Sequence, residues 1–443
     1  MLNILPFLSL LALQTGLSCD SPKASEDTSE TQEQPPPHRA LVLLSLDTFR
    51  RDHVGRYGGG VDTPFLDALA EKSLSLDAHH ACANWTYGAM ICALGGADGV
   101  DMGWVPYGGG TSPRIPDEMV LLPEVLGNNG FRTGLVSTNG YVGQTSKMNR
   151  YYDLFEAADM ASAADVVDVG LGMLDQLTFG DRWMLHLHFF DPHSPYWAPD
   201  DYLDGLSGLA PINYDLTEMS DVLRLDETWD GLDEATQALV IQHLEVRYRA
   251  SIRFMDDELG RLYAELESRG LLEDALVVVM SDHGEQFFEY DELEHGNSLH
   301  GVEVDTFAFF NGHNVTPAAW TEPTTHADLS PTILAQLGIE SDRLAPSEDL
   351  GGVGAVVGAA SPSRPLFAAK REDGESMQSV DRDGKRLIFT WDGQRKLYDL
   401  TQDPDERQDI YDSDPDGEAL WALLQPRVEA LDAMIEDYSP VIP

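Results

Sequence analysis

The pentapeptide Ser281-Asp282-His283-Gly284-Glu285 places a carboxylate beside an imidazole, a pairing that suits a divalent metal ion. It directly follows the apolar residues 276–280, and a short β-branched run of this kind is typical of a buried parallel strand. Open α/β sheets bind their ligands just beyond the carboxyl ends of such strands. We therefore expect Asp282 and His283 to be metal ligands, the alternative being a helix cap followed by a polar turn.

A second apolar run, residues 41–46, also ends in a carboxylate, Asp47, and continues as Thr48-Phe49-Arg50-Arg51-Asp52-His53. Two parallel strands that both end in Asp can aim their carboxylates into one crevice. A strand-terminal Asp on its own usually caps a helix. The pair favours a shared metal site at Asp47 and Asp282.

The composition narrows the classes of partner. The chain has 443 residues, with 76 Asp and Glu against 28 Lys and Arg, and a formal net charge of -48. This excess repels nucleic acids and anionic membranes, so no nucleic-acid partner is expected. An anionic substrate would have to overcome the same field, which favours a local cationic centre such as a metal ion. The length suits one large α/β domain with an appendage, or two domains.

The first residues have the pattern of an export signal. Residues 2–13 are mostly apolar and too short to span a bilayer, and Cys19 follows small residues as at a bacterial lipoprotein cleavage site. Residues 20–38 are polar and Pro-rich, which is typical of a flexible tether. We expect an exported protein, periplasmic or at the cell surface, with a possible membrane tether through lipidated Cys19. Cys82 and Cys92 would then pair as a disulfide or remain as two buried thiols.

Strand-like and helix-like segments alternate from about residue 39, which predicts a largely parallel sheet with helices on both faces. The expected strands are residues 41–46, 130–137, 183–190 and 276–280, and the expected helices are residues 63–70, 121–126 and 234–268. Residues 203–232 are acidic and have the composition of a loop-rich insertion. Beyond a Gly/Ala/Ser/Pro-rich linker at 341–364, residues 365–369 and 385–391 are predicted as antiparallel strands and residues 417–438 as a closing helix.

Six segments, taken in order, resemble the landmarks of bacterial sulfatases in the alkaline phosphatase superfamily. They are residues 45–58 with Thr63-Pro64, Asp191-Pro192-His193-Ser194-Pro195-Tyr196, residues 248–260 with 281–285, residues 294–299, residues 328–332 and residues 397–407. The resemblance covers about residues 40–412. It implies an alkaline-phosphatase-like α/β fold, with a mostly parallel sheet flanked by helices and a smaller C-terminal antiparallel sheet plus helix. The implied boundaries are a catalytic domain at 39–340 and a C-terminal subdomain at 365–443.

The resemblance also implies a set of metal ligands. Asp47, Asp282 and His283 match ligand positions, whereas Thr48 stands where the family often has a second Asp. Losing that carboxylate weakens the preference for calcium, which takes many oxygen ligands. One divalent ion is expected, and calcium, zinc and manganese all remain candidates.

The nucleophile region departs from the family pattern. Sulfatases carry Cys or Ser in a Cys-x-Pro-Ser-Arg motif, whose first residue becomes formylglycine. Residues 84–90 occupy that region here, and by register Thr86 takes the nucleophile position, with Met90 in place of Arg. Thr cannot yield formylglycine, so none is expected. A metal-activated Thr86 hydroxyl, as in phosphodiesterases of the superfamily, is one interpretation, and a helix cap is the other.

The groups that contact the substrate anion are also reduced. The stretch Ser137-Thr138-Asn139-Gly140-Tyr141 matches the position where sulfatases place a Lys and a His, and it has neither. His193 and His295 remain as candidate contacts to the ester oxygens, and either can protonate a leaving group. His193 can alternatively order its own loop.

These residues predict a metal-dependent enzyme, a hydrolase of sulfate or phosphate esters, with Thr86 as the unmodified nucleophile and a small molecule or glycan ester as the substrate. One alternative is a phosphodiesterase or phosphotransferase of the same superfamily. The other is a non-catalytic binding protein on the same fold.

Overall fold

The computed structural model describes residues 37–59, 63–105, 107–108, 114–157, 162–341, 344, 363–372 and 375–437. The predicted signal at 1–19, nearly all of the tether at 20–38 and most of the linker at 341–364 lie outside these residues. Within them, no helix combines the length and apolar character needed to cross a membrane. The elements below belong to the unit that begins at Pro37.

The main sheet is mixed but mostly parallel around its centre. Its order is β11-β2-β10-β7-β1-β6-β4-β5, with β12 beside β2, and β10 runs antiparallel to both of its neighbours. The bounds are β1 Ala40–Leu46, β2 Leu74–His80, β4 Arg132–Ser137, β5 Leu154–Ala157, β6 Trp183–Phe189, β7 Ala275–Ser281, β10 Asp305–Asn311, β11 Ala318–Trp320 and β12 Thr324–Thr325.

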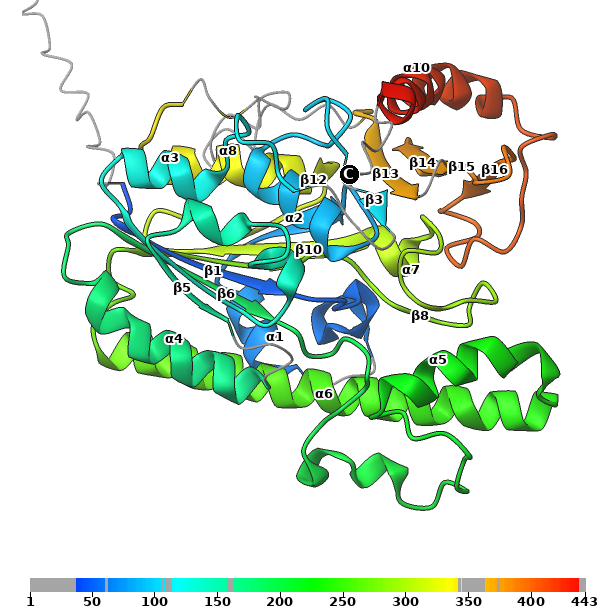
Figure 1. Ribbon diagram of the computed structural model, residues 1–443, viewed down its shortest axis with the longest axis horizontal. Helices are drawn as coiled ribbons and strands as arrows, with labels where there is room; N and C mark the ends of the chain where they lie inside the picture. Colours follow the sequence, from blue (N-terminus) through cyan, green and yellow to red (C-terminus); the bar gives the residue numbers. More distant parts are fainter. Residues whose placement is uncertain are drawn as a thin grey trace, which may run out of the picture. The chain divides into compact units, whose positions relative to one another are not determined.

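Helices cover both faces of this sheet (Figure 1). One side carries α1 Pro64–Ala70, α4 Ala163–Leu177 and α6 Glu234–Ser268, and the other carries α2 Thr86–Gly95, α3 Leu122–Asn128 and α8 Leu329–Gln336. Alternation along β1 explains the two layers, because Val42 and Leu44 pack into the first core while Leu41 and Leu43 pack into the second. Every residue of β1, β6 and β7 is buried, as expected for strands covered on both faces.

A second, smaller sheet has the order β16-β15-β14-β13-β3, and α10 packs on it (Figure 1). The bounds are β3 Tyr107–Gly108, β13 Leu366–Glu372, β14 Glu375–Arg382, β15 Lys385–Phe389, β16 Arg395–Asp399 and α10 Asp416–Asp437. The predicted fold class is therefore confirmed, an α/β main sheet with a C-terminal antiparallel sheet and helix. The predicted domain boundaries at 340 and 365 stay predictions.

Two local interpretations of the sequence need correction. Residues 203–232 are not only loop, because α5 Met219–Thr228 lies within them and buries Val222 and Leu225 one turn apart. Strand β14 was missed because it carries polar residues, yet it lies between β13 and β15, where the side chains of Gln378 and Asp381 are buried. Neighbouring strands, rather than its own composition, determine that it is a strand.

Candidate metal centre and active site

The register of the central strands brings the predicted carboxylates together. Leu46 lies opposite Ser281 of β7, and the amide of Asp282 donates to the Leu46 carbonyl at 3.1 Å, so Asp47 and Asp282 emerge side by side. The amides of Thr48 and His283 both donate to Asp282 Oδ1, at 3.1 and 2.7 Å. These bonds fix the carboxylate and leave its second oxygen, Oδ2, without a hydrogen-bond partner.

The side chain of Thr86 reaches these carboxylates from α2, which covers one face of the main sheet. It is the first residue of α2, and the N-cap position belongs to Trp85. The hydroxyl Oγ1 of Thr86 lies 3.4 Å from Asp47 Oδ1 and 3.4 Å from His283 Nε2. Its side chain therefore faces the carboxylates, and the helix-cap interpretation does not describe this residue.

Four donor atoms converge at spacings that suit one metal ion: Asp47 Oδ1, Asp282 Oδ2, His283 Nε2 and Thr86 Oγ1. Besides the two 3.4 Å contacts of Thr86, His283 Nε2 lies 3.6 Å from Asp47 Oδ1 and 3.6 Å from Asp282 Oδ2. Tetrahedral zinc ligands stand about 3.3–3.6 Å apart. Adjacent octahedral calcium ligands stand about 3.3–3.7 Å apart. The spacings therefore suit either ion, whereas four donors that include an imidazole are fewer oxygens than calcium takes.

The charges of this cluster call for a cation. Asp47, Asp282 and His283 have fully buried side chains, and the ion-pair partners recorded for the two carboxylates among the described residues are histidines. Burial, followed by the charge of Asp47, raises the pKa of Asp282 well above its usual range. Burial also raises that of Asp47, but the hydrogen bond from His188 and nearby imidazoles more than offset it, so the pKa of Asp47 falls below its usual range. A divalent ion would reduce the repulsion between the carboxylates of Asp47 and Asp282 and would give Asp282 Oδ2 a partner.

Thr48 adds a further unpaired oxygen beside this point. Its backbone has a positive φ of 53°, and its Oγ1 is buried without a hydrogen-bond partner. The hydroxyl of Tyr248 donates to the Thr48 carbonyl and accepts from the amide of Arg50 at 2.8 Å, which holds this strained turn in place.

A buried chain of hydrogen bonds orients Asp47 from behind. His188 Nε2 lies 3.3 Å from Asp47 Oδ2, and its Nδ1 is 2.8 Å from the hydroxyl of Ser45. Ser45 also contacts His186 Nε2 at 2.9 Å, and His186 Nδ1 contacts the Tyr152 hydroxyl at 2.7 Å. His188 lies close enough to both carboxylates to be a metal ligand itself. Because its contact is with the outer oxygen of Asp47, we assign it an orienting role.

The sequence contains a pattern that could have predicted this series of hydrogen bonds. His186 and His188 stand two residues apart, so they share one face of β6, and Ser45 lies directly opposite His188. Two histidines on one face of a fully buried strand next to β1 require buried polar partners.

Asn139, which the sequence did not single out, adds a polar group to the site from the stretch 137–141, where sulfatases place a Lys and a His. Its side-chain amide Nδ2 lies 2.8 Å from Asp47 Oδ2 and 3.2 Å from Thr86 Oγ1. The amide of Tyr141 donates to Asn139 Oδ1 at 2.9 Å, which fixes the direction of this side chain. A neutral donor therefore stands at the carboxyl end of β4, within reach of the hydroxyl.

His193 and His295 lie on loops beside the metal ligands. The His295 ring is 4.5 Å from that of His283 and 4.9 Å from that of His193, between ring centroids. His295 Nδ1 bonds to the buried carboxylate of Glu285 at 3.0 Å, and His193 Nδ1 bonds to the carbonyl of Ser194 at 2.6 Å. Each bond occupies Nδ1, and among the described residues neither Nε2 has a recorded hydrogen-bond partner.

The pKa values of these two imidazoles are shifted in opposite directions. Burial lowers the pKa of His193, but the charges of Asp47 and Glu285 outweigh it, so the net pKa is raised. Burial and the neighbouring His193 lower the pKa of His295 to about 3. Paired groups whose pKa values diverge in this way are typical of acid and base positions.

Glu303, which the sequence did not single out, joins three segments of the site. Its fully buried carboxylate accepts from Asn84 Nδ2 at 2.8 Å, from the amides of Gly296 and Ser298 at 2.9 and 3.0 Å, and from Gln286. Asn84 precedes Thr86, Gln286 follows the metal strand, and Gly296 follows His295. One carboxylate therefore holds three segments together: the one that leads into Thr86, the one that follows β7 and the one that carries His295.

Cys82 and Cys92 are joined by a disulfide, with a Cα–Cα distance of 6.3 Å. Of the two alternatives that the sequence left open, the structure has the bonded pair. The bridge ties the segment before α2 to the middle of that helix, and Thr86 lies between the two cysteines.

Comparison with known proteins gives one family. Residues 39–339 match the family model described as Sulfatase. A choline-sulfatase of Rhizobium meliloti is 24% identical over 254 residues, which is 55% of this chain and 48% of that protein. An arylsulfatase of Clostridium perfringens is 21% identical over 285 residues, 62% of this chain and 58% of that protein. The chain thus spans about half the length of these curated relatives.

Solved structures show the same fold. The structure of BT4656 in complex with D-glucosamine-2-N,6-O-disulfate has a TM-score of 0.70 at 15% identity, covering 92% of this chain and 99% of that one. A phosphonate monoester hydrolase of Agrobacterium radiobacter has a TM-score of 0.64 at 15% identity, covering 90% and 96%. At this identity the likeness establishes the fold alone.

Proposed function

The chain belongs to the sulfatase family of the alkaline phosphatase superfamily, and we propose that it is a metal-dependent hydrolase of sulfate or phosphate esters whose nucleophile is the unmodified hydroxyl of Thr86. The observation that carries this proposal is the convergence of Thr86 Oγ1 with Asp47 Oδ1 and His283 Nε2, at 3.4 Å each, in a cluster without a resident Lys or Arg among its recorded partners.

Each site residue then has a role that follows from its contacts. Asp47, Asp282, His283 and Thr86 would hold one divalent ion, which supplies positive charge that lowers the pKa of a hydroxyl and screens an anionic ester. Asp47 Oδ1 accepts the hydroxyl hydrogen of Thr86, and Asn139 donates to Thr86 Oγ1, so these two side chains orient the hydroxyl. We assign to His193, whose Nδ1 is held by the Ser194 carbonyl, the role of protonating the leaving alcohol through Nε2.

Both ester classes have support. The relatives named above are sulfatases, whereas a phosphonate monoester hydrolase shares the fold. A further relative, 27% identical over 183 residues, is the multifunctional alkaline phosphatase superfamily protein PehA of Trinickia caryophylli. The absence of Cys or Ser at position 86 shifts weight from formylglycine chemistry towards a direct phosphoryl or sulfuryl transfer to Thr86. The substrate is proposed to be a small molecule or glycan ester.

The test combines metal analysis with a substrate panel. Purified protein would be analysed for bound metal and assayed on aryl sulfates, phosphate monoesters and phosphate diesters. We expect turnover on at least one class, lost in Thr86→Ala and in Asp282→Asn, retained in Thr86→Ser and unchanged in the control Thr332→Ala, a buried threonine of α8. A covalent adduct on Thr86, detected by mass spectrometry after rapid quenching, would identify the nucleophile.

Each contrary outcome removes a defined part of the proposal. Protein without metal and without turnover on any class would leave the non-catalytic binding protein. Full turnover in Thr86→Ala would remove the nucleophile assignment while keeping the metal centre. Transfer of the group to an added alcohol in place of water would indicate a phosphotransferase.

We also propose that the protein is exported and tethered through Cys19. The support is the sequence pattern of residues 1–19. Cell fractionation of the wild type and of Cys19→Ala would test it, with the wild type expected in the membrane fraction and the variant released. Wild type remaining in the soluble fraction would contradict the lipid tether.

A further inference from the structure

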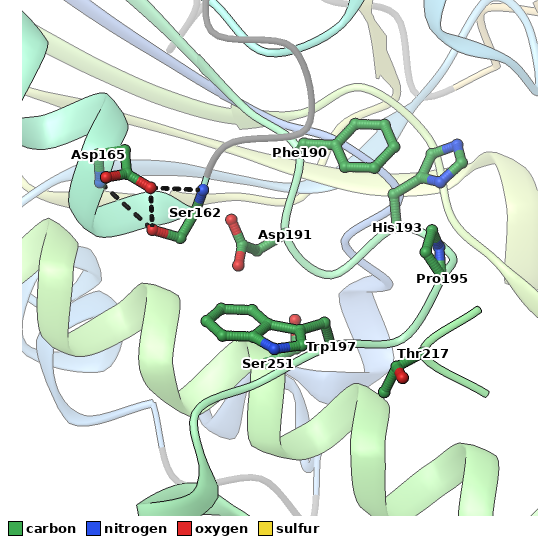
Figure 2. A pocket seen from close by; sticks show the side chains of 9 residues that line it. All are labelled: Ser162, Asp165, Phe190, Asp191, His193, Pro195, Trp197, Thr217 and Ser251. Atoms are coloured by element: carbon green, nitrogen blue, oxygen red, sulfur yellow. Dashed lines mark hydrogen bonds between the residues drawn. The ribbon is translucent and has the colours of Figure 1, made fainter. Parts of the chain in front are cut away.

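A cavity of about 410 Å³ lies against His193, on the side of the molecule covered by α4 and α6. Figure 2 shows its walls, which come from the loop after β6, the first turn of α4, α6 and the segment around Thr217. The volume is that of a pocket for a small organic molecule. His193 is shared between this cavity and the metal centre, because its ring also contacts that of His295.

The back of the cavity holds an incompletely bonded carboxylate. Asp191 is only 8% exposed, and its Oδ2 has no hydrogen-bond partner. Burial, together with the charges of Asp165 and Glu258, raises the pKa of Asp191 to about 7, even though backbone amides including that of Ala163 act to lower it. A desolvated carboxylate with one bare oxygen is unfavourable until it meets a proton or a cation.

Aromatic rings flank this carboxylate. In Figure 2 the Asp191 side chain lies with Phe190 on one side and Trp197 on the other. Phe190 stacks on His193 at 4.3 Å between centroids, which fixes its ring. Trp197 is 47% exposed and packs against Phe254 in an edge-on arrangement, so its own ring remains accessible. A carboxylate between two aromatic rings is the arrangement that recognises organic cations.

The surroundings favour positive over negative ligands. None of the described lining residues is Lys or Arg, and Asp165 adds a second acidic group at the rim. Arg261 is close to α4, but its guanidinium is engaged with Glu258 and Asp168. Asp191 and Asp165 together provide fewer oxygens than calcium or magnesium requires, so an inorganic ion is a poor occupant.

We propose that this cavity binds a protonated amine or quaternary ammonium group in the alcohol portion of the ester, so that the substrate is a zwitterion with its anionic group at Thr86. The assignment of the alcohol portion rests on the proposed function. Its position follows from His193, which lines the cavity and whose ring also contacts that of His295 beside the metal ligands. Glycans that carry further sulfate groups would meet Asp165 and Asp191 and be repelled.

The binding test does not depend on turnover. Tetramethylammonium would be titrated into the full-length protein and into Thr86→Ala by calorimetry, with tert-butanol as an uncharged control of similar size. We expect the cation to bind both proteins at least tenfold more tightly than tert-butanol. The preference should be lost in Asp191→Asn and weakened in Trp197→Ala, an exposed position that tolerates truncation. Asp201→Asn, an exposed acid on the same loop, is the matched control and should bind normally.

Equal binding of tetramethylammonium and tert-butanol, or unchanged cation binding in both Asp191→Asn and Trp197→Ala, would overturn the cavity's assignment. Cation binding without hydrolysis of any ester would retain the cation site and remove only its link to a leaving alcohol. If esters are hydrolysed, those of ammonium alcohols should exceed those of neutral alcohols at least tenfold in kcat/KM, and Asp191→Asn should erase that difference. A preference for polysulfated glycans would contradict the proposal.

Discussion

Two clusters of Asp and His in this acidic protein contain nearly the same residues but differ in the cation that balances their negative charge. The strand-end cluster, Asp47, Asp282 and His283, holds an unpaired Asp282 oxygen and histidines as its recorded partners. The inter-sheet cluster, His80, Asp305 and Asp381, has ligand atoms spaced closely enough for a metal as well. There, however, Arg386 lies fully buried between the acids, 2.6 Å from both Asp305 and Asp381, and it also pairs with Glu406 at 3.0 Å.

The difference shows that the resident cation, and not the number of acids, separates a structural cluster from a candidate active site. Arg386 on β15 joins Asp305 of the main sheet to Asp381 of the second sheet, so its charge stabilises the contact between the two sheets. It also holds the pKa of Asp305 below its usual range although burial acts to raise it, whereas the pKa of Asp282 is raised. In the strand-end cluster the recorded partners include no Lys or Arg among the described residues, and the proposed divalent ion would supply the positive charge.

Removing the resident cation should give the largest effect on stability. Arg386→Leu would leave the buried Asp381 and Glu406 and the partly exposed Asp305 without their partner, and we expect a loss of about 3–5 kcal/mol in the free energy of unfolding. Urea denaturation measures this. The matched control is Arg39→Leu, which breaks an exposed pair with Asp181 and should cost less than about 1 kcal/mol. A loss below that level in Arg386→Leu would contradict the structural role of the inter-sheet cluster.

Removing the proposed metal ion should have the next largest effect, and only through the strand-end cluster. At 100 to 1,000 times the dissociation constant, a metal stabilises the folded state by about 2.7–4.1 kcal/mol. Chelation should therefore lower the melting temperature of the wild type and of Arg386→Leu, but not that of Asp282→Asn. Loss of the chelator response in Asp305→Asn, with retention in Asp282→Asn, would place the metal in the other cluster.

Changing the pH should change the stabilising contributions of two acids in opposite directions, the fully buried Glu303 and the partly exposed Asp305. The folded pKa of Glu303 is raised to about 7, mainly by burial, so the folded state holds a proton that the unfolded state releases. Glu303 therefore makes the wild type gain stability as the pH falls from about 7 towards about 4.5, by up to about 3 kcal/mol. The depressed pKa of Asp305 works the other way: its stabilisation is present above an unfolded pKa of about 3.9 and is lost as the pH falls below it.

Urea midpoints of the wild type, Glu303→Gln and Asp305→Asn across this range would separate the two contributions. Glu303→Gln should lose the gain between about pH 7 and pH 4.5, and Asp305→Asn should lose the steep fall below about pH 4. Identical slopes in the wild type and Glu303→Gln would contradict the raised pKa.

Sequence reasoning found the parts of the site that the strands themselves dictate. Asp47 and Asp282 follow apolar runs, and parallel pairing brings two such ends together whatever the loops do. Asn139 and Glu303 could not be found in this way, because each acts through a loop whose path depends on tertiary contacts, with Glu303 bonding to residues as far away as Asn84. The same limit applies to Arg386, whose partners come from two sheets that the sequence does not align.

The smallest expected effect is at Tyr152. This residue is the last in the series of buried hydrogen bonds that orients Asp47 of the strand-end cluster. Tyr152→Phe removes the hydroxyl that contacts His186 Nδ1 and should lower stability by about 1 kcal/mol. Because His186, Ser45 and His188 still separate it from Asp47, metal affinity should fall only a few-fold, whereas His188→Ala should cost about 10–100-fold. Metal titration of both variants measures this gradient, with Tyr57→Phe, whose hydroxyl contacts Asp77, as the control. Equal losses in Tyr152→Phe and His188→Ala would mean that the chain acts as one rigid unit, and no loss in either would reduce it to buried packing beside the metal centre.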